Sequence, residues 1–199
     1  MMRIFSYIFL LVLTAGLTRY ATAQSSPEPT RYAFTSETQL FIDGTSSLHD
    51  WTCDIESSTG GFTTLAANES TLSSIESGFV SIDVDDIECG KGTMNKKLKK
   101  ALTINDAESI DFALTAASVT SEDGGALSFD LSGDLTIAGT TRPVALMATG
   151  SSTNGTIRLE GSYSLLQTDF GVDPPTALLG RLKTGDEVTI RFVVTATQN

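Results

Sequence analysis

Strict alternation of apolar and polar side chains is the strongest constraint that this sequence places on its fold. Between Leu127 and Ile137, every odd position except Gly133 holds Leu, Phe or Ile, and every even position holds Ser, Asp or Thr. Successive side chains of a β-strand point to opposite faces, so this pattern predicts a strand with one dry and one wet face. The pattern recurs in the stretches 40–42, 80–84, 110–114, 144–148, 157–165 and 188–194.

Turn signals separate these stretches. Asn154-Gly155 and Ala138-Gly139 stand between alternating runs, where such pairs favour tight hairpins. We also predict turns at 58–61, 122–125 and 184–186, which contain glycine. A meander with one apolar face hides that face by closing into a barrel or by stacking as a sandwich, and strands of this length suit a small barrel. The sequence therefore predicts an all-β, antiparallel barrel in a single domain over residues 32–199.

One segment departs from the β pattern. Residues 94–102 carry apolar side chains at Met94, Leu98, Ala101 and Leu102, a spacing that predicts a short amphipathic α-helix. The opposite face carries four lysines, and two interpretations of them stay open. They form either a solvated helix face or a positive patch for a phosphate headgroup or an anionic membrane surface. The patch consists of Lys96, Lys97, Lys99 and Lys100.

The N-terminus resembles a secretory signal. Arg3 precedes an apolar run that ends near Leu17, and Ala21-Thr22-Ala23 matches the small-x-small pattern of a cleavage site. The run is too short to cross a hydrocarbon core of about 30 Å. We expect residues 1–23 to be a removed signal peptide, residues 24–31 to be a flexible leader, and the mature protein to be periplasmic or secreted.

The net charge and the residue types present argue against nucleic-acid binding, catalysis and metal binding. The formal net charge is −11, which disfavours nucleic acid as a partner. His49 is the only histidine, and if it lies on a strand it points away from Asp50, so no catalytic pair forms there. We find no nucleophile motif and no set of residues with metal-ligand spacing. We therefore expect no catalytic residues, no metal and no cofactor, and we predict that the protein is not an enzyme.

Cys53 and Cys89 are the two cysteines of the chain. Export permits a disulfide, and an even count of cysteines favours one. A zinc site would need more nitrogen or sulfur ligands than two thiols and one histidine offer, and redox pairs more often have Cys-x-x-Cys spacing. We therefore predict a structural disulfide, with these two alternatives weaker.

Four segments carry a family resemblance. They are 44–51 (GTSSLHDW), 133–144 (GDLTIAGTTRPV), 168–175 (TDFGVDPP) and 185–190 (GDEVTI). In this order and spacing the chain resembles the YceI-like family of exported, polyisoprenoid-binding proteins over residues 32–197. The resemblance implies a lipocalin-like, eight-stranded antiparallel barrel with one short helix. It also implies that an isoprenoid or another long-chain lipid is held inside.

The interior of such a barrel is the expected ligand site. An eight-stranded barrel is just wide enough to be filled by side chains or to hold one slender ligand. By alternation, we predict ligand contacts from inward strand residues, with two helix residues near the mouth of the barrel. These contacts are Phe112, Leu114, Phe129, Leu131, Leu146, Tyr163 and Phe192, with Met94 and Leu98 near the mouth.

Three functions stay open at this point. The first is a lipid carrier or store, with transient contact to a membrane surface. The second is a ligand-free structural or protein-interaction module of the cell envelope. The third is an outer-membrane barrel, which is disfavoured because it requires a polar lumen. The sequence predicts no particular oligomeric state.

Overall fold

The structure is a computed structural model, and it describes residues 29–68, 71–90, 92–121, 126–177 and 182–199. The expected signal peptide, residues 1–23, lies outside the described residues. Strand β1 begins at Pro29, so residues 29–31 of the expected leader belong to the first strand instead. None of the helices in the described ranges combines the length and the apolarity that a bilayer crossing needs.

Strands dominate the fold, and each stretch with the alternating pattern lies in one of them, except that Val84 at the end of 80–84 begins a 3₁₀ turn. The strands are β1 (Pro29–Phe34), β2 (Gln39–Ser46), β3 (Trp51–Ile55), β4 (Thr59–Asn68), β5 (Thr71–Asp83), β6 (Ile87–Glu88), β7 (Ser109–Ser121), β8 (Ala126–Ile137), β9 (Thr140–Thr153), β10 (Thr156–Leu166), β11 (Thr176–Ala177) and β12 (Leu182–Gln198). The helices are α1 (Gly92–Leu102) and the 3₁₀ turns η1 (Val84–Asp86), η2 (Ile104–Asp106) and η3 (Gln167–Phe170).

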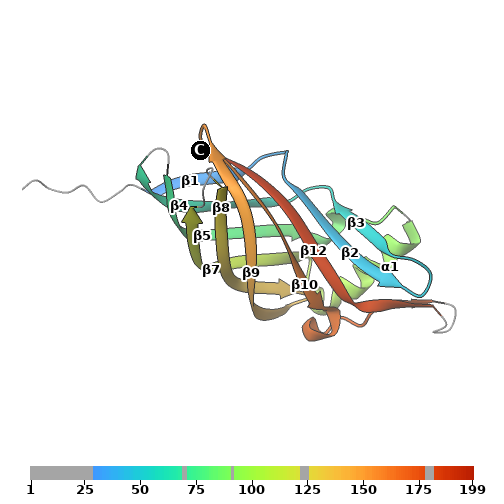
Figure 1. Cartoon of the computed structure of the whole chain (residues 1–199). Coiled ribbons are helices and arrows are strands. Elements are labelled where there is room, and N and C mark those ends of the chain that lie inside the picture. The colour runs from blue at the N-terminus through green and yellow to red at the C-terminus, as the bar shows by residue number, and fades with distance from the viewer. Residues whose placement is uncertain (1–28, 69–70, 91, 122–125, 178–181) are drawn as a thin grey trace, which may run out of the picture.

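Eight of these strands close into an antiparallel ring, which confirms the predicted barrel. The order around the ring is β1-β4-β5-β7-β8-β9-β10-β12, and β12 returns to β1. Closure joins the two ends of the described chain, with Tyr32 opposite Gln198 and Phe34 opposite Ala196. Figure 1 shows the strands wrapping around one interior, with the C-terminus beside β1.

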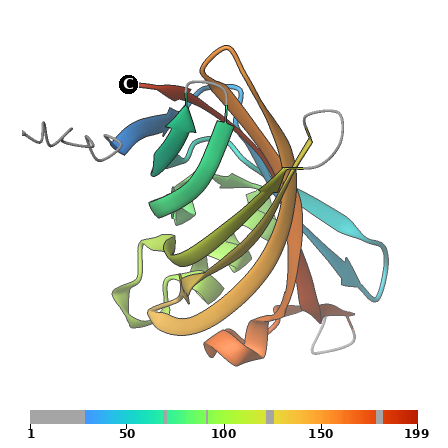
Figure 2. The same ribbon diagram turned by 60° about the vertical axis from the view of Figure 1, so that its left-hand side comes forward.

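At the opposite end, β12 pairs with β2 instead of β1, and the sheet continues through β3 to β6. Helix α1 follows β6 and covers this end (Figure 2). Leu98 and Leu102 of the helix are buried among the side chains of the barrel. The predicted amphipathic helix therefore forms, and it plugs one end of the barrel.

The predicted disulfide is present and ties this plug to the sheet. Cys53 of β3 is bonded to Cys89, which stands just before α1. Asn95 of the helix supports the same junction, because its side-chain oxygen accepts the Cys89 N–H at 2.9 Å. The side-chain nitrogen of Asn95 donates to a carboxylate oxygen of Glu88 at 2.5 Å. The start of the helix is therefore fixed by covalent and hydrogen bonds.

The tight hairpins form where the sequence predicts them. Ala138 and Gly139 between β8 and β9 have φ values of 51° and 75°, and Asn154 and Gly155 between β9 and β10 have 50° and 74°. Two successive positive φ values are the mark of a type I′ turn, whose twist matches that of the flanking strands. These two loops therefore set the register of three neighbouring strands.

Two other predicted turns are wrong. Gly60 and Gly61 lie inside β4, where the Phe34 ring and the Tyr32 carbonyl oxygen occupy the space in which side chains would stand. Gly185 lies inside β12, at an irregularity of the pairing with β2. All three glycines relieve close contacts within strands rather than ending the strands. The predicted turn at 122–125 lies outside the described residues.

Candidate functional site: an apolar cavity in the barrel

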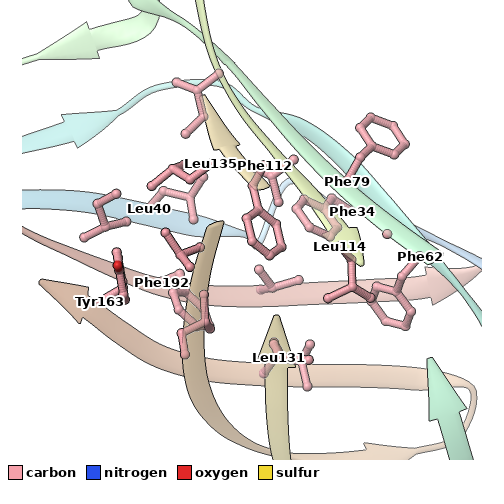
Figure 3. Close-up of a pocket in the computed structure, with 18 of the residues that line it drawn as sticks. Phe34, Leu40, Phe62, Phe79, Phe112, Leu114, Leu131, Leu135, Tyr163 and Phe192 are labelled. Carbon is pink, nitrogen blue, oxygen red and sulfur yellow. The ribbon is translucent and has the colours of Figure 1, made fainter. Parts of the chain in front are cut away.

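The interior of the barrel contains a cavity of about 160 Å³ between two buried clusters. The first cluster lies under α1 and includes Leu40, Ile82 and Leu98. The second lies where β1 closes the ring and includes Phe62, Phe129 and Ile157. Side chains from both clusters line the cavity, so it is a gap in the packing along the length of the barrel. Figure 3 shows Leu40 and Tyr163 at one end of it and Phe62 and Leu114 at the other.

The cavity wall is almost entirely hydrocarbon. Leu, Ile, Val and Phe side chains and two glycines make up the lining, and Tyr163 contributes the single hydroxyl group among the described lining residues. No charged side chain lies among them. Such a wall offers dispersion contacts and few hydrogen bonds, so it suits an apolar chain.

Glycines explain why the aromatic rings leave this space open. A Cβ on Gly161 would lie 2.6 Å from Cζ of Phe192, and a Cβ on Gly133 would meet the ring of Phe112. The ring of Phe34 covers Gly60 in the same way. Each ring therefore fills the space above a glycine on another strand and lies along the wall of the barrel.

Six of the nine predicted contact residues line this cavity: Phe112, Leu114, Leu131, Leu146, Tyr163 and Phe192. Alternation identified them, since inward positions of neighbouring strands face one lumen. Phe129 is also inward but lies outside the cavity lining, because it is packed at 1% exposure within the cluster at the β1 end.

The two predicted helix contacts lie elsewhere. Met94 and Leu98 line a separate cleft of about 230 Å³ between α1 and the β2–β3 hairpin. Leu98 belongs to the closed, packed end of the barrel. Helix α1 therefore closes one end of the barrel and does not lie at an opening of the cavity.

The four helix lysines do not converge on one point. Lys99 pairs with Asp85 at 2.5 Å, and Lys97 donates to the backbone oxygen of Thr176 at 3.1 Å. Lys96 and Lys100 are exposed. None of the four is among the described residues that line the cavity. Their predicted role as a headgroup patch stays a prediction.

Sequence reasoning missed Phe34, Phe62 and Phe79, which also line the cavity. Phe34 lies in β1 and Phe62 lies in β4. The sequences of these two strands show little alternation, so the pattern did not assign either residue to the inward face. Phe79 stands on the polar side of its strand by alternation with Val80, and it is 55% exposed. One feature of the sequence could have identified Phe79, because a large aromatic side chain is unusual on the polar face of a strand.

His49 and Asp50 lie in the loop between β2 and β3, and Trp51 begins β3. Nδ1 of His49 lies 2.7 Å from the backbone oxygen of Asp50, and the Trp51 indole donates to the Thr45 oxygen at 3.0 Å. The Trp51 ring covers Gly44, the partner of Trp51 across the β2–β3 ladder. Within the described ranges, no group of His, Cys, Asp and Glu side chains is arranged to hold a metal ion.

Two of the segments that carry the resemblance meet at the β10–β12 end. The carboxylate of Asp186 accepts hydrogen bonds from the Thr168 hydroxyl at 2.6 Å and the Thr168 N–H at 2.9 Å. These bonds hold the pKa of Asp186 below its usual value. The Gln167 side chain donates to the Gly185 oxygen at 2.9 Å. These residues therefore fasten η3 to β12 and have a structural role.

A closed antiparallel barrel with an apolar interior and a helix over one end defines the lipocalin-like class of folds. The YceI-like domain matches residues 34–196, and the chain belongs to this family. No curated protein matches the chain.

Solved structures share the fold at low sequence identity. BcnA from Burkholderia cenocepacia is 18% identical, with a TM-score of 0.64 and coverage of 80% of this chain and 96% of that one. A polyisoprenoid-binding domain from Saccharophagus degradans is 12% identical, with a TM-score of 0.66 and coverage of 86% and 100%. The YCEI protein of Campylobacter jejuni is 14% identical, with a TM-score of 0.53 and coverage of 74% and 84%.

Proposed function

We propose that this protein is an exported binding protein that holds a polyisoprenoid or a similar long-chain amphiphile in the barrel, as a carrier or a store, and that it is not an enzyme. The observation that carries the proposal is the cavity itself, whose described lining contains no charged side chain and a single hydroxyl group. The polyisoprenoid-binding domain from Saccharophagus degradans, which shares the fold, supports the ligand class.

The size of the cavity limits how the ligand is held. A cavity of about 150 Å³ in a protein core takes up a molecule the size of benzene, and this cavity measures about 160 Å³. It therefore accommodates a short section of a chain as it stands. Each buried CH₂ contributes about 0.8 kcal/mol, so about five carbon units supply about 4 kcal/mol, which corresponds to a Kd of about 1 mM. Tighter binding requires the remainder of the molecule to displace side chains or to contact the surface of the barrel.

Mass spectrometry of the purified protein tests this proposal. We expect native spectra and solvent extracts to contain a co-purified apolar molecule. Leu146→Phe should narrow the cavity and reduce the amount of that molecule, because Leu146 lines the cavity. Met147→Phe is the matched control, because Met147 is the next residue along β9 and is 73% exposed.

A ligand-free spectrum for the unaltered protein, together with no uptake of a neutral apolar dye such as Nile red, would favour the protein-interaction alternative. Export is tested separately by the mass of the mature chain. We expect a mature N-terminus at Gln24, and retention of Arg3 in the mature protein would contradict the proposed signal peptide.

A further inference from the structure

The barrel has an open seam on the side away from helix α1. Strands β5 and β7 pair only from Phe79 to Asp83 and from Ser109 to Ala113. Both strands continue past this ladder, β5 back to Thr71 and β7 on to Ser121, and their other edges stay paired with β4 and β8. We call residues 75–77 of β5 and residues 115–119 of β7 the seam, because Gly78 and Leu114 still face each other, with a Cβ on Gly78 lying 3.6 Å from Cβ of Leu114. No backbone pairing joins the two sides within these described residues.

Two bulges cause the strands to diverge there. In β5, Ser77 pairs with Thr63 and Ile75 pairs with Thr64, so Glu76 is an extra residue. In β7, Leu114 pairs with Gly133 and Ala116 with Ser132, so Thr115 is extra. A bulge bends its strand and strengthens the local twist. Bulges on both sides of the seam, just beyond the last ladder pair, therefore turn the two strands away from each other.

The cavity reaches the surface at this seam. Ile75, Gly78 and Phe79 line it from β5, and Leu114 lines it from β7. Among the described lining residues, Phe79 alone is exposed, at 55%. Figure 3 places Phe79 near Leu114 and Phe34 and far from Tyr163. The opposite end is closed by the buried side chains of α1. Phe79 is therefore the residue at which the described lining of the cavity meets the surface.

The strands on both sides of the seam carry acidic and no basic side chains, while Arg31 of β1 lies in register with the seam, opposite Thr63, which pairs with Ser77. Strands β5, β7 and β8 contain no Lys or Arg. Glu76, the bulged residue, is exposed and accepts a hydrogen bond from Ser74 at 2.6 Å, and Asp130 of β8 is also exposed. The exposed Ser77 and Thr115 add hydroxyl groups. This rim repels a phosphate group and provides acceptors for a neutral or cationic head.

We propose that an amphiphile enters the cavity tail-first through the seam between β5 and β7, and that its neutral or cationic head stays at the seam beside Glu76. This inference rests on the proposed function and specifies its ligand class and its route of access. The lysine patch on α1, at the plugged end, leads to the opposite expectation of a phosphate head.

The access route is tested by blocking each end of the barrel. Ser77→Cys places a thiol at the seam, and Leu48→Cys is the matched control on the exposed β2–β3 hairpin near α1. Each variant has one reactive thiol, because Cys53 and Cys89 are bonded to each other. Both are labelled with fluorescein maleimide, and stopped-flow fluorescence measures the exchange of Nile red in labelled and unlabelled protein.

We expect the label on Ser77→Cys to slow the exchange of Nile red by about tenfold, which corresponds to about 1.4 kcal/mol in the barrier. The label on Leu48→Cys should leave the rate unchanged. The route would be overturned if labelled and unlabelled Ser77→Cys exchanged Nile red at the same rate. It would also be overturned if the label on Leu48→Cys slowed the exchange instead. If Ser77→Cys does not fold, Glu76→Cys replaces it on the same side of the seam.

The head group is tested by competition against Nile red with dodecanol, dodecylamine and dodecyl phosphate. We expect the phosphate to compete about tenfold less well than the amine at low salt, with a smaller difference at high salt because exposed charges are screened. Glu76→Lys should reduce that difference. Equal or stronger competition by the phosphate would overturn the inference and favour the lysine patch. Failure of Nile red and of all three compounds to bind would instead overturn the proposed function itself.

Discussion

The ring of Phe192 stands where a side chain on Gly161 would otherwise lie. The two residues are direct partners on β10 and β12, and a Cβ on Gly161 would also come within 2.7 Å of the Met147 backbone oxygen. The ring therefore has room to lie along the wall because its partner has no side chain. Phe112 of β7 covers Gly133 of β8 in a similar way from a diagonal position, since the direct partner of Gly133 is Leu114. The open lumen thus depends on glycines as much as on the apolar residues that line it.

Gly161→Ala should close part of the cavity. The added methyl group pushes the Phe192 ring toward the lumen, since the Met147 backbone cannot yield easily. We expect about tenfold weaker binding of Nile red and a loss of about 1–3 kcal/mol in unfolding free energy from overpacking. Titration with the dye and urea denaturation measure the two effects. Ser162→Ala, at the next and exposed position, is the control, and equal dye affinity in both variants would contradict the explanation.

Phe129 and Leu131 should respond differently to truncation, although both are inward residues of β8. Phe129→Ala empties a fully packed site and should cost about 3–5 kcal/mol of unfolding free energy, as large core truncations do. Leu131→Ala enlarges a cavity that already exists, so we expect a smaller cost and a changed dye affinity. Urea denaturation and dye titration of both variants check this, and equal costs would show that Leu131 is packed as tightly as Phe129.

Removing the disulfide should destabilise the plugged end. The Cys53–Cys89 bond spans 36 residues of sequence. A disulfide that closes a loop of this size stabilises a folded protein by about 2–4 kcal/mol. We expect Cys53→Ala combined with Cys89→Ala to unfold at lower urea concentration than the oxidised protein. Adding dithiothreitol to the unaltered protein should reproduce the shift, and adding it to the double variant should have no effect. A midpoint that is the same in the oxidised protein and the double variant would be inconsistent with a stabilising bond.

The ion pair of Asp43 and Arg191 predicts a pH dependence of stability. The hydrogen bond from Arg191 is the largest influence on Asp43 and holds the pKa of its carboxyl below the ordinary value of 3.8. A lowered pKa stabilises the fold above pH 3.8, and that contribution is lost as the pH falls through the value in the folded protein. Both side chains are partly exposed, so we expect at most about 1 kcal/mol.

Thermal unfolding between pH 2 and pH 6 measures this dependence. The unaltered protein should lose stability more steeply below pH 4 than Asp43→Asn, which cannot titrate at that position. Asp50→Asn serves as the control, because no ion pair involves Asp50 among the described residues. Parallel pH profiles for the unaltered protein and Asp43→Asn would contradict a stabilising role for the pair.

Alternation predicted the strands and their dry face, and strand length together with the family resemblance predicted the barrel. Alternation then identified six lining residues, because period two fixes the face of each strand once the fold is closed. It does not tell a filled lumen from a hollow one, since Phe129 and Leu131 follow the same pattern and differ only in what packs against them. The seam was also beyond sequence reasoning. It depends on two one-residue bulges at Glu76 and Thr115, and neither residue type marks a bulge.

Strand β12 closes the ring through its last residues, which pair with β1 near the other end of the described chain. Contacts between such distant parts of a chain form slowly, because a large loss of chain entropy precedes them. The hairpins from β7 to β10 join strands that are adjacent in the sequence, so they can form before β1 and β12 pair. A chain shortened before Val194 would keep most of its hairpins, yet it would have two free sheet edges, and free edges are sites where chains aggregate.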